Sequence, residues 1–380
     1  MARSPDVIVI GGGMIGCSVA EALARRGAAI TVLERGRIGD GAPRAAAGFV
    51  WPTMSSATRN AWFDACLTAS TSYGGVAARL RDETGMDVEY RRSGALRVAD
   101  GATERDDLRA KGEWMRAAGV DISWLEIDDA RRLEPGLAPD LAGALWLPDA
   151  GQVRGDLIAA ALGRAAALRG ADVRQQVAVL GIERRGDTVT GVRTSEGTLA
   201  AGHVVLAAGA WSGPLSAALP RPLLVRPIKG QSLLAAAPAG WVRHVVTGTA
   251  ASLVPRSGGQ VYIGATIEDA GFDIRPTLGE IAGRIRGADR LMPGAASLAF
   301  SDVRVGLRPA SPALVPIVGP VPECRGLVAA TAHYRNGILL GPLTGEAVAE
   351  IVLRTGTPEG RAALGMLDRI GALTRGTVAS

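Results

Sequence analysis

Residues 6–36 read DVIVIGGGMIGCSVAEALARRGAAITVLERG. Asp6 is followed by the β-branched, apolar run at 7–10. Such a run is typical of a parallel strand covered on both faces. Glycines at 11–13 and 16 follow directly. Apolar residues then recur at helical spacing until Gly27 ends the helix, and a second apolar strand closes on Glu34. This order predicts a βαβ unit that binds a dinucleotide.

Each glycine of the turn has an expected task. Gly11 permits the tight turn, Gly13 lets backbone amides approach a pyrophosphate, and Gly16 lets the helix pack closely on the strand. The helix N-terminus adds a partial positive charge. The carboxylate of Glu34 would accept hydrogen bonds from an adenosine ribose and repel a 2′-phosphate, which argues against NADP. The unit alone does not distinguish NAD from FAD.

The composition indicates a globular protein of about two domains. The chain has 380 residues, of which 47% are hydrophobic and 21% charged, and it contains no apolar run of about 18 residues. We expect a soluble, cytoplasmic protein without a membrane span. The N-terminus is not expected to be a signal peptide, because Asp6 and the glycines interrupt its apolar run. The three cysteines, Cys17, Cys66 and Cys324, have no metal-ligand spacing and suit a reducing compartment.

The basic residues do not predict a nucleic-acid partner. The net charge is +5, and the sequence pI is about 9.5, but the arginines are scattered. Among basic residues, only Lys111 and Lys229 are lysines. No basic stretch exceeds a doublet, as at 25–26 or 184–185, and we interpret these residues as a solvated surface.

The remaining patterns predict an α/β fold with two interleaved domains. Residues 1–85, 151–221 and 301–380 are assigned to a Rossmann-like, nucleotide-binding domain with a mixed, mostly parallel sheet. Residues 86–150 and 222–300 are assigned to an α+β substrate domain that contains an antiparallel sheet. No metal site is predicted.

Several motifs together resemble a known family. In chain order they are GGGMIG (11–16) with Glu34, the small-residue loop Gly41 to Gly48, VVLAAGAW (204–211), GLRPASP (306–312) and HYRNGILLGP (333–342). The chain resembles the FAD-dependent oxidases of the D-amino-acid oxidase (DAO) family, nearest to the glycine oxidases, with sarcosine oxidase and D-amino-acid dehydrogenase as relatives. The resemblance covers nearly the whole chain.

The resemblance implies that the nucleotide-binding domain holds FAD. Because no cysteine occurs between Arg325 and Ser380, where sarcosine oxidase attaches its flavin, we expect the FAD to be noncovalent. The residues that the resemblance assigns to FAD are Gly11, Gly13, Met14, Ile15, Gly16, Glu34, Arg35, Arg44, Ala45, Ala46, Ala47, Gly48, Val179, Ala208, Gly209, Trp211, Arg308, Arg335, Asn336, Gly337 and Ile338.

The resemblance also implies the reaction. A small primary or secondary amino acid would lose a hydride from its α-carbon to flavin N5, water would hydrolyse the imine to a 2-oxo acid and an amine, and O2 would reoxidise the flavin to give H2O2. Arg308 would pair with the substrate carboxylate, and Arg335 would contact either the flavin or the substrate. His333 is interpreted as a packed residue beside the flavin. Lys229 is interpreted as a surface lysine, with an oxygen-activating cation as the alternative.

Two departures from the family pattern bear on the site. Ser252 stands where the family often has a tyrosine that helps to hold the carboxylate, so the substrate could be larger than glycine, unless Tyr262 fills the gap. Pro43 replaces a common serine in the flavin loop and removes an amide donor.

Two other functions stay open. The chain could be a dehydrogenase that passes electrons to a quinone or a protein, or a flavin-binding pathway subunit without independent turnover. The family also suggests a homo-oligomer.

Overall fold

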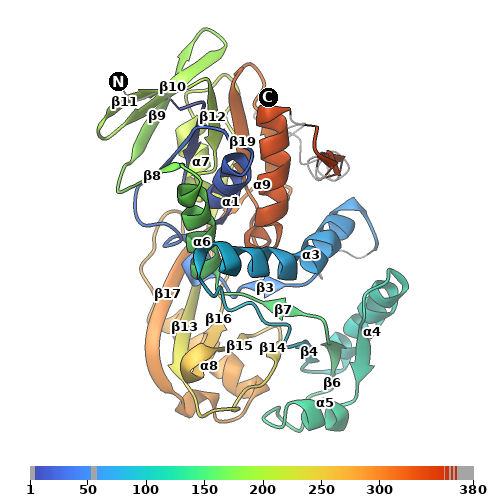
Figure 1. The fold of residues 1–380 in the computed structure, drawn as a ribbon. Coiled ribbons are helices and arrows are strands. Elements are labelled where there is room, and N and C mark those ends of the chain that lie inside the picture. Colours follow the sequence, from blue (N-terminus) through green and yellow to red (C-terminus); the bar gives the residue numbers. More distant parts are fainter. Residues whose placement is uncertain (1–4, 53–57, 355, 359–360, 363, 366–380) are drawn as a thin grey trace.

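The structure is a computed structural model that describes residues 5–52, 58–354, 356–358, 361–362 and 364–365 (Figure 1). One of its two large sheets has six strands. In spatial order these are β18 (Ile317–Pro320), β19 (Leu327–Thr331), β12 (His203–Leu206), β1 (Val7–Ile10), β2 (Ile30–Glu34) and β8 (Asp172–Gln175). All neighbours are parallel except β18 and β19. This sheet confirms the predicted Rossmann-like arrangement.

The alternation of side chains along β1 explains how this sheet is covered. Val7 and Val9 share a core with α1 (Met14–Ala24) and α9 (Gly337–Leu353). Ile8 and Ile10 point to the opposite face, where they share a core with a three-stranded antiparallel sheet. The strands of that sheet are β9 (Val179–Arg185), β10 (Thr188–Thr194) and β11 (Gly197–Ala200). Both faces of β1 are therefore buried, as its unbroken apolar sequence predicts.

Helix α3 (Ala61–Thr84) crosses the middle of the molecule (Figure 1). It begins at Asn60, whose side chain accepts a hydrogen bond from the Phe63 amide at 2.9 Å, and it ends at Gly85 with a left-handed φ of 70°. It packs against α9 and against α6 (Gly155–Leu168).

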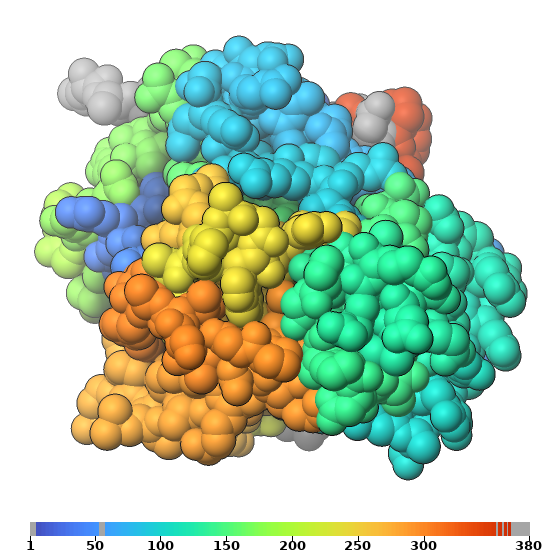
Figure 2. Space-filling model, turned by 90° about the horizontal axis from the view of Figure 1, so that it is seen from below, coloured from blue at the N-terminus to red at the C-terminus, as the bar shows by residue number. Residues whose placement is uncertain are grey.

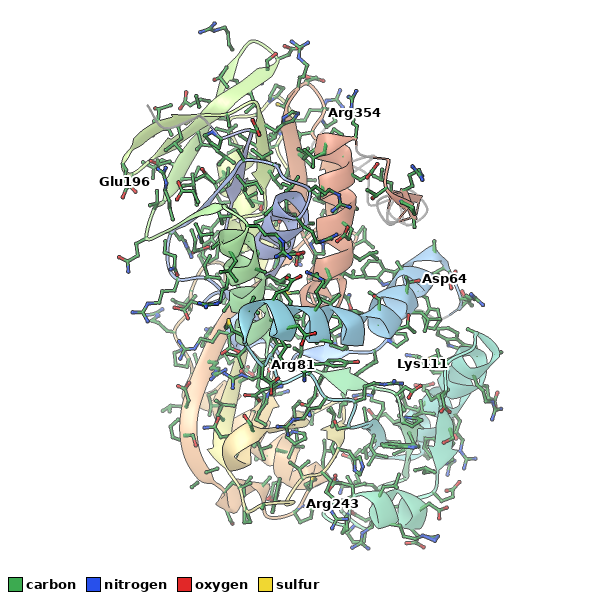
Figure 3. The ribbon with its side chains drawn as sticks, viewed as in Figure 1. Asp64, Arg81, Lys111, Glu196, Arg243 and Arg354 are labelled. Carbon is green, nitrogen blue, oxygen red and sulfur yellow. The ribbon has the colours of Figure 1, made fainter. Side chains whose placement is uncertain are left out.

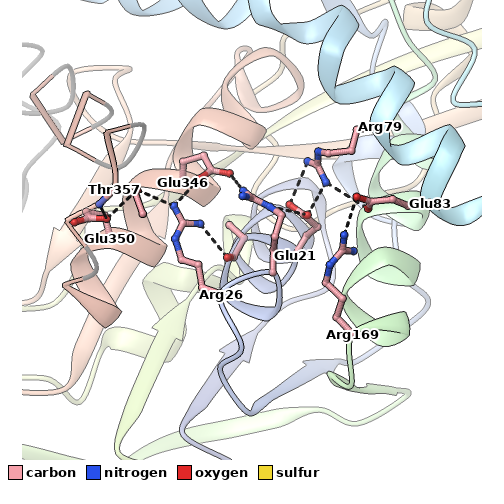
Figure 4. Close-up of polar contacts among 10 residues, drawn as sticks. Glu21, Arg26, Arg79, Glu83, Arg169, Glu346, Glu350 and Thr357 are labelled. Atoms are coloured by element: carbon pink, nitrogen blue, oxygen red, sulfur yellow. Dashed lines mark hydrogen bonds and ion pairs between the residues drawn. The ribbon is translucent and has the colours of Figure 1, made fainter.

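Ion pairs join the helices α1, α3 and α9 (Figure 4). Glu21 of α1 is buried, and one of its carboxylate oxygens lies 2.7 Å from Nη1 of Arg79 on α3. Arg26, just after α1, pairs with Glu346 of α9 at 2.8 Å. These contacts fix α1, α3 and α9 relative to one another, since a buried carboxylate is stable only when it is paired.

The second large sheet has eight strands. In spatial order they are β17 (Ala299–Ala310), β13 (Arg226–Ala236), β16 (Gln260–Gly264), β15 (Ser252–Arg256), β14 (Val245–Thr247), β4 (Ala95–Ala99), β6 (Gly143–Leu147) and β5 (Ser123–Leu125). Its neighbours are antiparallel except β14 and β4. This sheet confirms the predicted antiparallel component of the fold.

Helices cover the two faces of the eight-stranded sheet. Leu96 and Val98 of β4 share a core with α5 (Ile127–Leu133) and α8 (Leu278–Leu291), while Ala95 and Ala99 share one with α4 (Ala102–Ala117). Seen from below, residues 102–150 form a teal and green lobe beside the yellow and orange strands (Figure 2).

Short elements complete the described chain. They are α2 (Ala42–Ala45), β3 (Phe49–Val50), β7 (Gly151–Gln152), α7 (Ser212–Ser216) and three short 3-10 turns at Gly209–Trp211, Ser257–Gly259 and Ala295–Ser297. The expected domain boundary at 300/301 falls inside β17, which pairs along its length with β13 of the eight-stranded sheet. The division into two domains stays a prediction.

Charged side chains are spread over the molecule. Arg81 lies on α3, Lys111 on α4, Arg243 before β14 and Arg354 after α9, and these side chains point outward in separate places (Figure 3). Within the described residues, no helix is both long and apolar enough to cross a membrane.

Candidate active site

A cavity of about 960 Å³ lies between the two large sheets. One wall is formed at the carboxyl ends of β1, β2, β12 and β19, where ligands bind in open α/β sheets. The other wall is formed by strands of the eight-stranded sheet. The walls are completed by residues 40–43, 45–49, 178–180, 333–335 and 337–338.

The glycine turn shapes the first wall. Gly11 has a φ of 106°, and a Cβ on Gly16 would lie only 1.8 Å from the Gly11 carbonyl oxygen, so the turn and the helix touch at that point. A Cβ on Gly13 would meet no atom within 4 Å. Gly13 faces the cavity, and α1 begins there without a side-chain cap. The first amides of α1 are therefore available to an anion.

Glu34 is fixed at the end of β2. Its Oε2 accepts a hydrogen bond from the Gly12 amide and its Oε1 accepts one from the Gly36 amide, both at 2.7 Å. The next residue, Arg35, places its guanidinium 3.4 Å from the ring centre of Trp211. Glu34, Arg35 and Trp211 all line the cavity. The Glu34 carboxylate can accept hydrogen bonds from a ribose, and the stacked side chains of Arg35 and Trp211 add a cationic and aromatic surface beside it. Together they are suited to bind an adenosine.

The small-residue loop forms the middle of the cavity. Ala45, Ala46, Ala47 and Gly48 line it. The Tyr262 hydroxyl donates to the Ala45 carbonyl at 3.1 Å and so joins this loop to β16. Pro43 lies in the first turn of α2, where backbone amides make no hydrogen bond within the helix. The missing amide of Pro43 therefore costs α2 no hydrogen bond.

Helix α9 also begins at the cavity. Gly337 and Ile338 line the cavity, and Asn336 precedes the helix without a side-chain cap bond. Arg335 is exposed and also lines the cavity. A second helix N-terminus thus faces the cavity and stabilises negative charge there.

His333 is a buried residue of this wall, as expected. Its Nε2 lies 2.9 Å from the Thr344 hydroxyl. Burial lowers the pKa of His333 to about 3, so the ring is neutral at physiological pH. A neutral, hydrogen-bonded ring fits packing beside a cofactor rather than acid–base catalysis.

Arg308 of β17 lines the second wall. Its Nη1 donates to the carbonyl oxygens of Thr266 at 3.0 Å and Lys229 at 3.2 Å. Burial lowers the pKa of Arg308. Among the described residues, no carboxylate lies within 4.0 Å of its guanidinium, and the positive charge is left for a ligand.

The interpretation of Lys229 as a surface lysine is wrong. Its side chain is 2% exposed, and its Nζ donates to the Arg275 carbonyl at 2.6 Å and lies 3.8 Å from a Glu268 carboxylate oxygen. It does not line the cavity. Lys229 is buried because β13 is buried along nearly its whole length and the segment that contains Glu268 and Arg275 packs over its side chain.

The structure gathers most of the other expected residues at the cavity, with three exceptions. Met14, Ile15, Val179, Ala208, Gly209 and Ser252 line it. Gly16, Arg44 and Asn336 do not. Arg44 is exposed, and its Nη2 lies 3.6 Å from an Asp302 carboxylate oxygen.

The sequence reasoning missed other polar residues of the lining. Arg97, Thr247, Thr249 and Arg284 line the second wall, and Arg37 and Asp40 the first. No local motif marks them, because each comes to the wall through long-range strand pairing or loop packing. Within the described part of the chain, no group of three or more His, Cys, Asp or Glu side chains is placed to hold a metal ion.

Comparisons with known proteins agree with this geometry. Residues 6–351 match the model of the family described as DAO, FAD dependent oxidoreductase. The chain is 35% identical to a glycine oxidase from Geobacillus kaustophilus (strain HTA426), over 98% of this chain and 99% of that protein. The crystal structure of glycine oxidase from Geobacillus kaustophilus superposes with a TM-score of 0.89 over 93% of this chain and 96% of that one.

Two further relatives differ in their described activity. The structure of an iminodiacetate oxidase (IdaA) from Chelativorans sp. BNC1 is similar with a TM-score of 0.84 at 29% identity, over 93% of this chain and 98% of that one. The hydrogen cyanide synthase subunit HcnC of Pseudomonas aeruginosa is 32% identical over 93% of both chains.

Proposed function

This chain belongs to the DAO family of FAD dependent oxidoreductases, and we propose that it oxidises a small primary or N-substituted amino acid to a 2-oxo acid and an amine, with O2 as electron acceptor. Its membership makes it a FAD-dependent amine or amino-acid oxidoreductase. The observation that carries the proposal is the guanidinium of Arg308, which lines the cavity wall without a carboxylate partner among the described residues.

The cavity fits FAD. Gly13 and the first turn of α1 would hold the pyrophosphate, Glu34 and Arg35 the adenosine ribose, and Val179 the adenine. The segments 45–48 and 335–338 would hold the isoalloxazine. When bound, FAD supplies an acceptor for the two electrons and the hydrogen that leave the substrate carbon. None of the three buried cysteines lines the cavity, and we propose that FAD is noncovalent.

The residues of the second wall would bind and orient the substrate. The planar guanidinium of Arg308 can hold a carboxylate through two parallel hydrogen bonds, which fixes the position of the adjacent α-carbon. Loss of the hydride requires a neutral amine but no dedicated side-chain base. This requirement agrees with a His333 that is neutral and bonded to Thr344. The imine then leaves for hydrolysis by water, with the oxygen of that water entering the 2-oxo acid.

One comparison favours a role as a subunit of a larger enzyme. HcnC is described as a subunit of a hydrogen cyanide synthase, so a similar chain can be part of a larger enzyme. We keep a dehydrogenase or pathway subunit as the second candidate function.

Anaerobic titration tests the proposal. The purified protein, loaded with FAD, is mixed with glycine, sarcosine, D- and L-amino acids and acidic amino acids, and the flavin absorbance is followed. Bleaching by any of them, followed by H2O2 formation when O2 is admitted, is the expected result. Bleaching without H2O2 would favour the dehydrogenase. An unchanged spectrum with the whole panel would overturn the proposed function.

A further inference from the structure

One row of residues crosses the eight-stranded sheet at the cavity. Arg97 of β4 is paired with Thr247 of β14, Thr247 with Ser252 of β15, and Ser252 with Gly264 of β16. Residues directly opposite each other in a sheet project from the same face. All four residues line the cavity. Ser252, next to Thr247, has a small side chain and leaves space in front of β15. Gly264 leaves none, because a Cβ there would lie 2.8 Å from the Tyr262 hydroxyl oxygen.

Two hydroxyls hold Arg97 in place. Its Nη1 donates to the Thr247 hydroxyl at 3.0 Å and its Nη2 to the Thr249 hydroxyl at 3.3 Å. The side chain is half-buried. In the described part of the chain, no carboxylate lies within ion-pair distance of it. The acidic residue whose charge acts on it, Glu104, accepts hydrogen bonds from Thr249 and from the Asp100 amide and does not line the cavity.

The charged side chains of the second wall are all positive. Arg97, Arg284 and Arg308 line this wall, and the exposed Arg335 lines the cavity from the segment before α9, whereas the acidic lining residues, Glu34 and Asp40, belong to the first wall. Burial lowers the pKa of both Arg97 and Arg308, and the positive charge of Arg335 lowers both further. One monocarboxylate substrate would neutralise a single one of these charges. Since charges removed from water are stable only when paired, the wall favours a ligand with more than one anionic group.

We propose that the substrate is an amino acid with two carboxylates, and that Arg97 binds the second carboxylate while Arg308 holds the one next to the reacting carbon. The proposal rests on the proposed function. N-carboxyalkyl amino acids and α-amino dicarboxylic acids share this chemistry, and the row of Arg97, Thr247 and Ser252 determines specificity for it. The small side chain at 252 gives the second arm its space.

A pair of substrates that differ in one charge tests the proposal. Iminodiacetate is compared with its monoamide, which has the same shape but one carboxylate. Sarcosine serves as the small reference substrate. D- and L-aspartate and glutamate test the second class of diacid, the α-amino dicarboxylic acids. We expect kcat/KM to be about 30-fold higher for the better diacid than for its monoamide, because the half-buried guanidinium of Arg97 gains a charged partner.

Variants assign this preference to Arg97. In Arg97→Gln the preference for the diacid should fall to about twofold or less, mainly through KM, and the loss should be larger for the diacid than for sarcosine. Arg97→Lys should restore part of the preference. Arg243→Gln removes an exposed arginine of the same region (Figure 3) and should change nothing. Binding of succinate and of succinamate, which cannot be oxidised as amines, is measured by perturbation of the flavin spectrum. Succinate should bind more tightly, and Arg97→Gln should abolish the difference.

Three results would overturn the proposal. Equal kcat/KM for iminodiacetate, the amino dicarboxylates and their amides, with sarcosine turned over, would refute it and leave the proposed function standing. An equal loss in Arg97→Gln for charged and uncharged substrates would make Arg97 structural. Failure of every amine to bleach the flavin would overturn the proposed function, and this inference with it.

Discussion

The two walls of the cavity are built in different ways. The first wall is mostly backbone: the amides of the glycine turn, the start of α1 and the end of β2 come from a segment of the chain at 10–36. The second wall is mostly side chains, and its row of four residues combines position 97 with positions 247, 252 and 264. The first wall suits a ligand that many proteins share, and the second is where a chain can change its substrate without changing its cofactor.

This contrast predicts that substitutions in the two walls have separable effects. Changes in the second wall should alter substrate kinetics at constant flavin content. Changes in the first wall should alter flavin content or stability at constant substrate preference.

The largest effect is expected for Arg308→Gln. Without the guanidinium, the substrate carboxylate would lose its charged partner, and kcat/KM should fall by a factor that corresponds to about 2 to 5 kcal/mol. The ratio of flavin absorbance to protein absorbance should not change. Arg243→Gln is the control. Loss of flavin in parallel with activity would mean that Arg308 serves the cofactor and would remove the distinction between the walls.

The next effect is expected for Gly16→Ala. The added methyl would lie 1.8 Å from the Gly11 carbonyl oxygen, so the variant should lose roughly 3 kcal/mol of unfolding free energy and part of its FAD. Gly75→Ala is the matched control, because Gly75 is exposed in α3 and its Cβ would meet nothing within 4 Å. That variant should be as stable as the parent or more stable by up to about 1 kcal/mol. Thermal unfolding and flavin content are the measurements, and equal behaviour of the two variants would contradict the tight contact.

Glu34→Gln should have a smaller effect. The amide side chain can accept one of the hydrogen bonds that the Gly12 and Gly36 amides donate, but it lacks the charge. We expect the Kd for FAD to rise about tenfold, which is roughly 1.4 kcal/mol, while KM for the amino acid stays constant. Reconstitution of the apoprotein with FAD measures this. A changed substrate preference with normal FAD affinity would contradict the assignment of Glu34 to FAD binding.

His333 predicts a pH dependence of stability. Its pKa is lowered by burial from 6.5 to about 3, so between these values the unfolded chain binds a proton that the folded chain does not. Above pH 6.5 His333 is neutral in both states and costs no stability. As the pH falls from 6.5 toward 3, protonation of the unfolded chain lowers the free energy of unfolding, which should be roughly 1 kcal/mol smaller at pH 5.5 than at pH 7.5 through this group. Denaturant unfolding of the parent and of His333→Asn measures it. The two proteins would show the same pH slope if His333 were not buried and neutral.

Local patterns predicted the first wall well. The strand at 7–10, the helix from Met14 and the strand ending at Glu34 form as the spacing of apolar residues and glycines indicates, because each of these features depends on neighbours in sequence. The position of Glu34 beside the glycine turn follows from the parallel pairing of β1 with β2.

The second wall was predictable only in part. Arg308 was identified through family resemblance rather than through any pattern of its own. Lys229 was assigned to the surface because lysine is rarely buried, and the covering of its strand by distant segments reversed that. Arg97 reads like any outward residue of a strand, and only the pairing of β4 with β14 reveals that it faces the cavity.

A crystal structure of the protein grown with FAD and acetate, a carboxylate that cannot be oxidised as an amine, would locate both ligands. We predict that the isoalloxazine lies between residues 45–48 and 335–338 and that the acetate oxygens accept hydrogen bonds from the Arg308 guanidinium. An isoalloxazine bound elsewhere, or a carboxylate held away from Arg308 with the ring in place, would contradict this prediction.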